Sequence, residues 1–366
     1  MSEQLPTLGI WGPAPRDKSG VAGYITHSLP HLARHFTTHR ITGPGHDPAA
    51  FDHVLYHLGN NALHHGAFRA LAARPGTILL HEYNNLDYYY EAWDQLPAAE
   101  QQAVLTRVGN AVGTRLDTRA DMEQYFADHP HVDRYSLNAR IEDLAIGAAT
   151  RVLVHSPLLA EHLADRHPTA DIRHLPFPAE PLTPVAGTRA RHGLPEQAFV
   201  FATFGFLGAY KRIPTLLDAW QNWTDRPADA LLLLAGEARD GLTVPADDPT
   251  VLHTGYLPDA EFDALLLAAD CGIQLRGPWL GETSGPASVL IAHRRPTILS
   301  DIPGMHPRRP EEIHLLVGQG EHESADLIDA MRTQYHRPRT PAAYDPAFSW
   351  KAWGERIAAA LTGAAA

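Results

Sequence analysis

Four loops of the sequence carry residues that can bind or polarise a ligand, and three of them also contain glycine. They are "DKSGVAGY" (17–24), "LLHEYNN" (79–85), "FGFLGAYKR" (204–212) and "GETSG" (281–285). Each follows an apolar segment that has the composition of a buried strand. Because ligands of open parallel sheets bind beyond the carboxyl ends of the strands, these loops are the first candidates for a functional site.

The first two loops offer groups that suit an anion or a sugar. Ser19 and Gly20 precede a helical pattern, and the unpaired amides at a helix start attract anions and hydroxyl groups. Turn geometry explains the same glycine equally well. His81 ends a strand, where an imidazole can bind a sugar hydroxyl or position a reacting group. A histidine with purely structural hydrogen bonds is the alternative.

The third loop carries two adjacent cations, Lys211 and Arg212, directly before a helical pattern. Their charges add to the field of the amides at the helix start, which is a combination suited to a diphosphate. A solvated basic pair is the alternative, although cations at this end oppose the helix dipole.

The fourth loop places Glu282 among small and hydroxyl-bearing residues, Thr283, Ser284 and Gly285, before a helix that Pro286 would start well. The carboxylate can hold a polar ligand whose other groups contact the backbone. It can also act only as a helix cap.

These loops lie in a chain that alternates strand-like and helix-like segments on both sides of a Pro- and Gly-rich stretch, residues 178–195. This alternation predicts two parallel-sheet α/β domains. The expected strands fall within residues 7–12, 52–59, 76–83, 149–156, 172–178, 199–208, 228–236, 250–255, 271–277 and 296–301. A final amphipathic segment, "SWKAWGERIAAAL" (349–361), has Trp350, Trp353, Ile357 and Leu361 along one face.

Composition narrows the classes of protein. The 366 residues carry 42 acidic against 30 basic side chains, a net charge of −12, which argues against nucleic-acid binding. Cys271 is the single cysteine, so no intramolecular disulfide forms. The 23 histidines are scattered without a metal-binding motif, so we expect no metal and no cofactor. No apolar run is long enough to span a membrane and no secretory signal is evident, so we expect a cytoplasmic protein.

The ordered set of loops, together with "LYHLGNN", "VLVHSPLLAEHL", "LLLLAGEA" and "RRPTILSD", resembles the bacterial retaining glycosyltransferases of family four, closest to the subgroup with a G-E-T-S-G donor loop. The resemblance covers nearly the whole chain. It implies a GT-B fold, in which two Rossmann-like domains face each other across a cleft. Residues 1–182 would form the acceptor-side domain, 183–347 the nucleotide-sugar domain, and 348–366 a helix that crosses back to the first.

The resemblance also implies roles for individual residues. Lys211 would grip the donor diphosphate, His81 would lie near the sugar and the leaving phosphate, and Glu282 would hold sugar hydroxyls; these three form the expected catalytic set. The remaining expected donor-binding residues are Ser19, Gly20, Gly208, Arg212, Tyr256 at the nucleobase, Thr283, Ser284 and Gly285.

The sequence departs from the family pattern at two positions. Phe206 replaces the arginine that normally accompanies the lysine, and Arg212 is the candidate to compensate. The second acid of the donor loop is missing, with Ser288 as a weak substitute for binding the ribose.

The resulting hypothesis is a metal-independent, retaining transfer of a sugar from a nucleotide-diphosphate sugar to an acceptor hydroxyl, with the acceptor unknown. The departures motivate the alternative, a GT-B protein that binds a nucleotide sugar or a partner without turnover. A nicotinamide-dependent dehydrogenase is disfavoured, since "GIWGPAP" lacks the glycine fingerprint.

Overall fold

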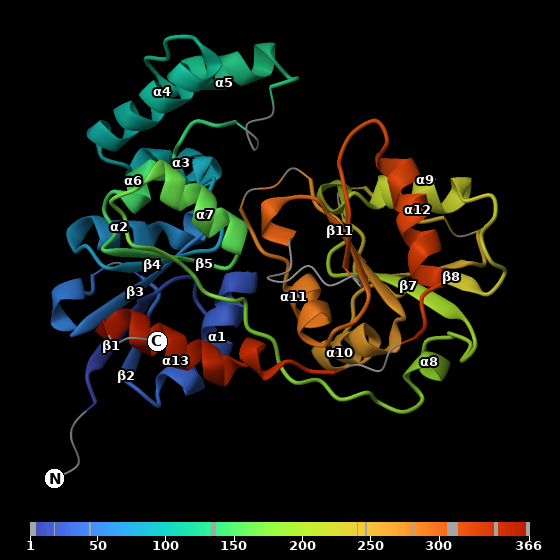
Figure 1. The fold of residues 1–366 in the computed structure, drawn as a ribbon. Helices are drawn as coiled ribbons and strands as arrows, with labels where there is room; N and C mark the ends of the chain where they lie inside the picture. The colour runs from blue at the N-terminus through green and yellow to red at the C-terminus, as the bar shows by residue number, and fades with distance from the viewer. Residues whose placement is uncertain are drawn as a thin grey trace. The chain divides into compact units, whose positions relative to one another are not determined.

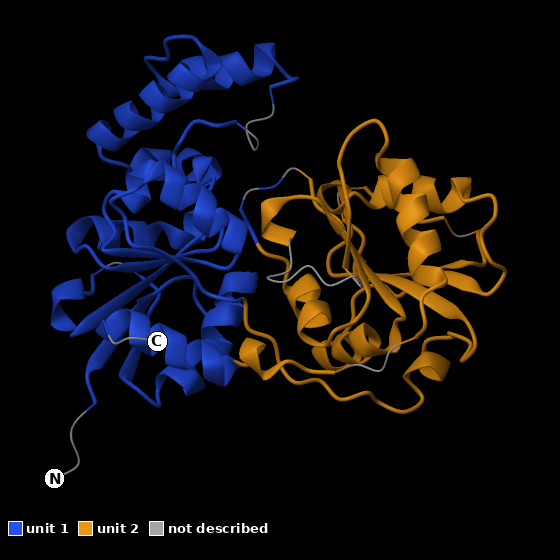
Figure 2. Cartoon of the chain, in the orientation of Figure 1, with its two compact units in different colours: residues 1–176, 278–282, 350–366 blue, residues 177–277, 283–349 orange. Residues whose placement is uncertain are grey.

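The computed structural model describes residues 5–17, 19–43, 45–132, 137–239, 241–245, 247–277, 279, 281–305, 314–339 and 343–363. The chain divides into two compact units, each built around its own parallel sheet (Figures 1 and 2). Unit 1 comprises residues 1–176, 278–282 and 350–366, and unit 2 comprises residues 177–277 and 283–349.

Unit 1 contains a six-stranded sheet in the order β2-β1-β3-β4-β5-β6, and all neighbouring strands are parallel. Its strands are β1 (Thr7–Trp11), β2 (Thr37–Ile41), β3 (His53–Leu58), β4 (Thr77–Leu80), β5 (Arg151–Val154) and β6 (Ile172–His174). Its helices are α1 (Gly20–Leu32), α2 (His65–Ala73), α3 (Leu86–Glu91), α4 (Ala98–Val112), α5 (Arg119–Asp128), α6 (Asp143–Ile146), α7 (Pro157–Arg166) and α13 (Trp350–Thr362).

Unit 2 repeats this plan with a six-stranded parallel sheet in the order β12-β11-β10-β7-β8-β9. Its strands are β7 (Phe199–Phe204), β8 (Ala230–Ala235), β9 (Val251–His253), β10 (Cys271–Gln274), β11 (Thr297–Ser300) and β12 (His314–Val317). Its helices are α8 (Thr188–Arg191), α9 (Ile213–Asn222), α10 (Asp259–Ala268), α11 (Gly285–Ala292) and α12 (Glu323–Tyr335).

The central strand β7 shows why these apolar runs form buried parallel strands. Phe201 belongs to the same core cluster as Trp220 of α9, whereas Val200 and Ala202 belong to a second cluster with Leu265 of α10. Successive side chains of a strand point to opposite faces, so an apolar run without polar interruption is buried on both sides. Every residue of β7 is buried accordingly.

The C-terminal helix α13 is part of unit 1, where it packs against α1 (Figure 1). Trp350, Trp353 and Ile357 are buried. Gly354 permits the close approach, because a Cβ atom there would lie 3.1 Å from His31 Cβ. The apolar face of the final segment is therefore the face that α13 buries.

The two parallel-sheet domains predicted from the sequence are confirmed, but three features were not anticipated. Strand β2 has an exposed and polar pattern, "TTHRI", which hides the strand signal. Strand β12 and the insertion of α3 to α6 between β4 and β5 were also missed. Within the described residues, the helices are too short or too polar to cross a bilayer.

Candidate functional site

Each sheet has a position where the strand order reverses, which is where open α/β sheets bind ligands. In unit 1 this position lies between β1 and β3, and in unit 2 it lies between β7 and β10. The expected site residues divide between the units, each of which is described by itself. Unit 1 holds Ser19, Gly20, His81 and Glu282; unit 2 holds Gly208, Lys211, Arg212, Tyr256, Thr283, Ser284 and Gly285.

Ser19 and Gly20 form the start of α1, directly beyond β1. Ser19 is the N-cap residue, and its side chain accepts a hydrogen bond from the backbone N–H of Val21 at 3.2 Å. No described atom lies within 4 Å of a Cβ built on Gly20, and the φ of this residue is not in the left-handed region. Neither packing nor backbone strain within the described residues therefore requires glycine here, and the space before the helix is open.

His81 follows β4 and lies in a group of buried histidines at the carboxyl edge of the first sheet. His57 of β3 is its direct neighbour, with Nδ1 of His57 hydrogen-bonded to Nε2 of His81 at 2.9 Å. The two rings stack at a centroid distance of 5.2 Å, and the ring of His155, after β5, lies 5.6 Å from that of His81. Sequence reasoning missed His57 and His155, although each occupies the carboxyl end of its strand, as His81 does.

The hydrogen bond between these rings requires one ring to donate and the other to accept. His57 Nε2 is buried and has no partner among the described residues. In one of the two tautomers, the proton of His57 is on Nδ1 and is donated to Nε2 of His81. His81 then carries its own proton on Nδ1.

His81 is a neutral group in this setting. Burial lowers its pKa well below the usual value, and the neighbouring His57, His155 and His64 oppose a positive charge further. At neutral pH the side chain can donate a hydrogen bond but does not hold a positive charge against a leaving phosphate. Tyr24, one turn into α1, lies beside it at a ring distance of 5.1 Å, which brings the start of α1 and His81 together.

Glu282 lies in a segment that packs on the loop after His81. Trp279 Nε1 donates to the backbone carbonyl of Glu282 at 3.0 Å, and the rings of Trp279 and Tyr83 are 5.5 Å apart. Gly281 has a φ of +93°, and a Cβ atom there would lie 2.3 Å from Tyr83 Cδ1. Glycine is thus required for this contact, and Glu282 is placed near the residue two positions after His81.

Ser284, and not Glu282, caps helix α11. Its hydroxyl oxygen accepts from the N–H of Ala287 at 3.4 Å, and the helix begins at Gly285. The N-cap position of α11 is therefore occupied by Ser284. Thr283 Oγ1 is buried without a partner among the described residues. Ser288 donates its hydroxyl proton to Ser284 O at 2.9 Å, so only its acceptor capacity remains for a ribose.

Lys211 is buried in unit 2, with 4% of its surface exposed. It ends the short 3-10 helix Ala209–Lys211, for which Gly208 is the N-cap, and its ammonium group donates to the backbone carbonyl of Phe204 at the end of β7. No ion pair to Lys211 is found among the described residues. Burial lowers its pKa well below the usual value, and the charge of Arg276 lowers the pKa further.

Arg212 does not accompany Lys211. It adopts a left-handed backbone conformation with a φ of +56°. Its guanidinium forms a two-bond ion pair with Glu323, the first residue of α12, in which Nε lies 3.0 Å from Oε1. Glu323 is 2% exposed. The charge of Arg212 is therefore already matched by a carboxylate.

Arg276 is the cation that sequence reasoning missed. It follows β10, the neighbour of β7, and its guanidinium carbon lies 5.0 Å from the ring centre of Tyr210. The sequence feature that could have identified Arg276 is its position just beyond the end of a buried strand, in "CGIQLRG".

Tyr256 follows the edge strand β9 and is 69% exposed. Gly255 before it has a φ of +68°, which turns the chain. Strand β8 separates β9 from β7, so two strand spacings, about 10 Å, separate the strand that leads to Tyr256 from the strand that leads to Lys211. A ring at this position is exposed and available for stacking on a planar group.

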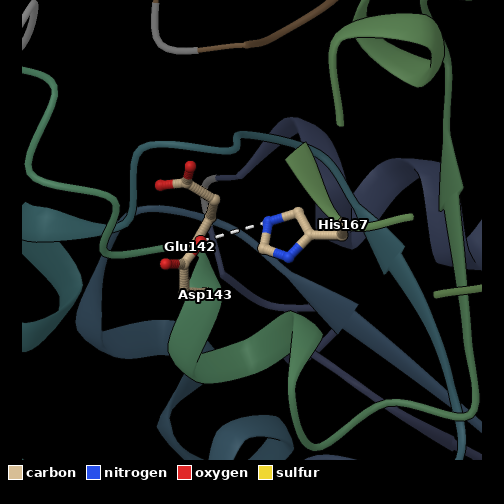
Figure 3. A group of neighbouring side chains, drawn as sticks. All are labelled: Glu142, Asp143 and His167. Carbon is tan, nitrogen blue, oxygen red and sulfur yellow. Dashed lines mark ion pairs between the residues drawn. The ribbon is translucent and has the colours of Figure 1, made fainter. Parts of the chain in front are cut away.

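Glu142, Asp143 and His167 form the one group among the described residues whose ligand atoms are close enough for a metal (Figure 3). Figure 3 shows the imidazole of His167 directed at Asp143, at 3.1 Å. The two carboxylates are already paired with three arginines. These pairs are Arg166 with Glu142 at 2.8 Å, and Arg107 and Arg140 with Asp143 at 2.8 and 3.1 Å. A metal ion would add positive charge to a group whose negative charge the arginines already balance. We therefore interpret the group as an ion-pair network.

Comparison with known proteins gives similarity of structure alone. No family model matches the chain, and no curated protein matches it by sequence. Sucrose-phosphate synthase from Thermosynechococcus elongatus matches 97% of this chain and 94% of its own, with a TM-score of 0.58 and 17% identity. The UDP-forming α,α-trehalose-phosphate synthase from Burkholderia vietnamiensis matches 98% of this chain and 100% of its own, with a TM-score of 0.55 and 10% identity. The structure of Anabaena HepE in complex with UDP and glucose matches 97% of this chain and 95% of its own, with a TM-score of 0.53 and 12% identity.

These matches extend over both units and nearly the full length of each neighbour. Together with the two six-stranded parallel sheets, they show that the chain has the GT-B fold with two Rossmann-like domains. The fold class expected from the sequence is confirmed. Because one fold supports many activities, the function has to be argued from the site residues.

Proposed function

We propose that the chain is a retaining glycosyltransferase that moves a sugar from a nucleotide-diphosphate sugar to an acceptor hydroxyl, without a required metal. Lys211 is the observation that carries this proposal. Its ammonium group is buried beside the reversal in strand order, hydrogen-bonded to a single backbone carbonyl, and without an ion pair among the described residues.

A buried ammonium group is unfavourable unless an anion compensates its charge. No carboxylate among the described residues pairs with Lys211 to explain why its ammonium group is buried. The phosphates of a nucleotide sugar would supply the compensating negative charge. The solved neighbours support this choice of ligand, since HepE is described in complex with UDP-glucose and trehalose-phosphate synthase is UDP-forming. UDP-sugars are therefore the first donors to test.

In the proposed reaction, the acceptor oxygen forms a bond to the anomeric carbon while the bond from that carbon to the phosphate oxygen breaks. The proton of the acceptor hydroxyl passes to the departing phosphate. Lys211 stabilises the negative charge of the departing diphosphate. His81 contributes a neutral Nδ1–H donor, and Glu282 accepts hydrogen bonds from sugar hydroxyls.

The activity is tested by offering UDP-, ADP-, GDP- and dTDP-glucose with a panel of acceptor sugars and measuring release of the nucleoside diphosphate, with and without EDTA. NMR of the product's anomeric proton reports retention. Lys211→Ala should reduce turnover and donor affinity about a hundredfold or more, because a charge-assisted phosphate contact contributes about 2–3 kcal/mol.

Three outcomes discriminate the alternatives. Binding of a nucleotide sugar without product would indicate a non-catalytic binding protein. Failure of every nucleotide and nucleotide sugar to bind would reject both readings. Loss of activity in EDTA would contradict metal independence.

A further inference from the structure

The loop between β7 and α9 lacks one residue that the family resemblance predicts. Phe206 stands where related sequences are expected to have an arginine that accompanies the lysine, and it is 40% exposed. Three arginines lie near this loop: Arg212, Arg239 and Arg276. They differ in how they lie relative to Lys211.

Two of the three are directed elsewhere. Arg212 is held by the buried carboxylate of Glu323. Arg239 lies over the ring of Phe206, 3.4 Å from its centre, with Glu237 at 3.7 Å. Arg276 instead lies beside the loop that carries Lys211: its guanidinium carbon is 5.0 Å from the ring centre of Tyr210, the residue before Lys211.

Arg276 and Lys211 approach each other because their strands are neighbours. Lys211 follows β7 and Arg276 follows β10, which pair in parallel, with Gly272 opposite Ala202. The order of the strands reverses between these two, since the chain continues from β7 through β8 and β9 and then returns to the other side of β7. The two cations therefore flank the position at which an open α/β sheet binds its ligand.

The backbone around Arg276 is fixed by three neighbouring elements. Its N–H donates to Ser300 Oγ, at the end of β11, at 2.9 Å. Its carbonyl accepts from the side-chain amide of Gln319, which follows β12. The N–H of Gly277 donates to the carbonyl of Tyr210 at 2.9 Å, which ties the loop to the residue before Lys211.

The space around the ammonium group of Lys211 is kept by glycine. A Cβ atom on Gly205 would lie 2.6 Å from Lys211 Nζ, and one on Gly236 would lie 2.0 Å from the carbonyl oxygen of Gly205. Both residues have positive φ, +97° and +152°. The ends of β7 and β8 therefore approach closely, and only glycine at position 205 leaves room for the ammonium group of Lys211.

Two cations on adjoining loops at a ligand-binding edge repel each other, and an anion that binds between them offsets this repulsion. We propose that Arg276 is the second diphosphate-binding cation of this chain and that it takes the part of the arginine missing at position 206. A guanidinium supplies two parallel N–H donors to phosphate oxygens, which the ammonium group of Lys211 does not. This inference rests on the proposed function, because the diphosphate is that of the nucleotide sugar.

The test is isothermal titration of the full chain with UDP, ADP and GDP, and with the matching monophosphate of whichever binds. Arg276→Gln should weaken binding of the diphosphate about 10- to 100-fold, and Arg276→Lys less, because charge is kept while the fork is lost. The matched control Arg239→Gln removes a neighbouring arginine and should change the affinity less than threefold. Circular dichroism and melting of the free protein verify that each variant is folded.

The outcomes separate this inference from the proposed function. Failure of all three diphosphates to bind the wild-type chain would reject the function itself. Binding to wild type with unchanged affinity in folded Arg276→Gln would overturn the role of Arg276 alone, and a loss in Arg239→Gln that exceeds the loss in Arg276→Gln would transfer the role to Arg239. If Arg276→Gln does not fold, Arg276→Lys decides the question, and wild-type affinity in that variant would overturn the two-donor contact.

Discussion

Replacing Lys211 by methionine should stabilise the ligand-free protein and weaken its binding of nucleoside diphosphate. Methionine has a similar length and no charge, so it removes the buried ammonium group and its repulsion from Arg276. Replacement of a buried ion pair by apolar side chains of similar volume is often neutral or stabilising by about 1–4 kcal/mol. We apply the stabilising range to Lys211, for which no ion pair is found among the described residues. The Phe204 carbonyl loses a donor in exchange, which costs about 1 kcal/mol.

The net change is a gain of up to about 3 kcal/mol in the free energy of unfolding of unit 2. For a domain of this size, each kcal/mol shifts the melting temperature by about 2–4 °C, so the expected increase is at most about 12 °C. Differential scanning calorimetry of the free protein measures this shift. Titration with UDP measures the accompanying loss, which we expect to be about a hundredfold.

The gain should depend on pH in a defined direction. The pKa of Lys211 is lowered on folding from its usual 10.5, so the unfolded chain binds the proton more tightly. Burial of the group therefore destabilises the wild type increasingly as the pH falls from about 10.5, and the full penalty is reached below the folded-state pKa. The stabilisation by Lys211→Met should consequently be smaller at pH 10 than at pH 7.

An exposed lysine provides the control. The side chain of Lys351 on α13 is 68% exposed, and its nearest carboxylate, on Glu355, lies 3.9 Å away. Lys351→Met should leave both the melting temperature and the UDP affinity nearly unchanged. A lower melting temperature for Lys211→Met would refute the reasoning, because it would show that the hydrogen bond to Phe204 makes the lysine a structural residue.

Three further changes test the expected site residues of unit 1 and their neighbours. Glu282→Gln should leave the melting temperature nearly intact and cut turnover, while UDP still binds, since the lost contact is to the sugar. Gly281→Ala should destabilise by about 1–3 kcal/mol, measured by urea unfolding, because of its positive φ and the clash with Tyr83. His57→Phe should remove the donor to His81 Nε2, and ¹⁵N NMR of the imidazoles should show His81 as a mixture of tautomers.

Each of these changes has a result that would contradict it. Equal losses of UDP and UDP-sugar affinity in Glu282→Gln would move its contact to the phosphate or the ribose; Ser284→Ala, which removes the true cap, provides the stability control and should cost about 1 kcal/mol. Wild-type stability in Gly281→Ala would show that its loop is not held against Tyr83. An unchanged His81 spectrum in folded His57→Phe would exclude control of the tautomer by His57.

The sequence predicted the architecture where patterns are local. Apolar runs such as Phe199–Phe204, which is buried on both faces, predicted the parallel strands. The loops after these runs indicated the candidate site residues. The edge strand Thr37–Ile41 gave no such signal, because two of its five residues are exposed and only Ile41 is buried. Expected roles in ligand binding remain predictions.

Contacts between distant segments were beyond the sequence pattern. Arg276 and Lys211 become neighbours only because β10 pairs with β7, and the order of strands is not encoded in the spacing of apolar residues. Likewise, the sequence made Arg212 and Lys211 equal candidates for binding an anion. The direction of each side chain depends on the backbone conformation, which the sequence pattern does not show. Its left-handed conformation and the buried Glu323 decide that direction.

The position of α13 has a consequence for the order in which the chain folds. Tyr24 of α1 contacts Trp350 and Trp353 of α13 at ring distances of 5.1 and 5.6 Å, so the core of unit 1 joins the first and last segments of the described chain. During synthesis, all residues of unit 2 are present once residue 349 has been added, whereas unit 1 still requires residues of α13, which follow. Unit 1 is thus complete only after α13 has been synthesised, and until then Tyr24 of α1 lacks the two tryptophan rings that it contacts in the folded unit.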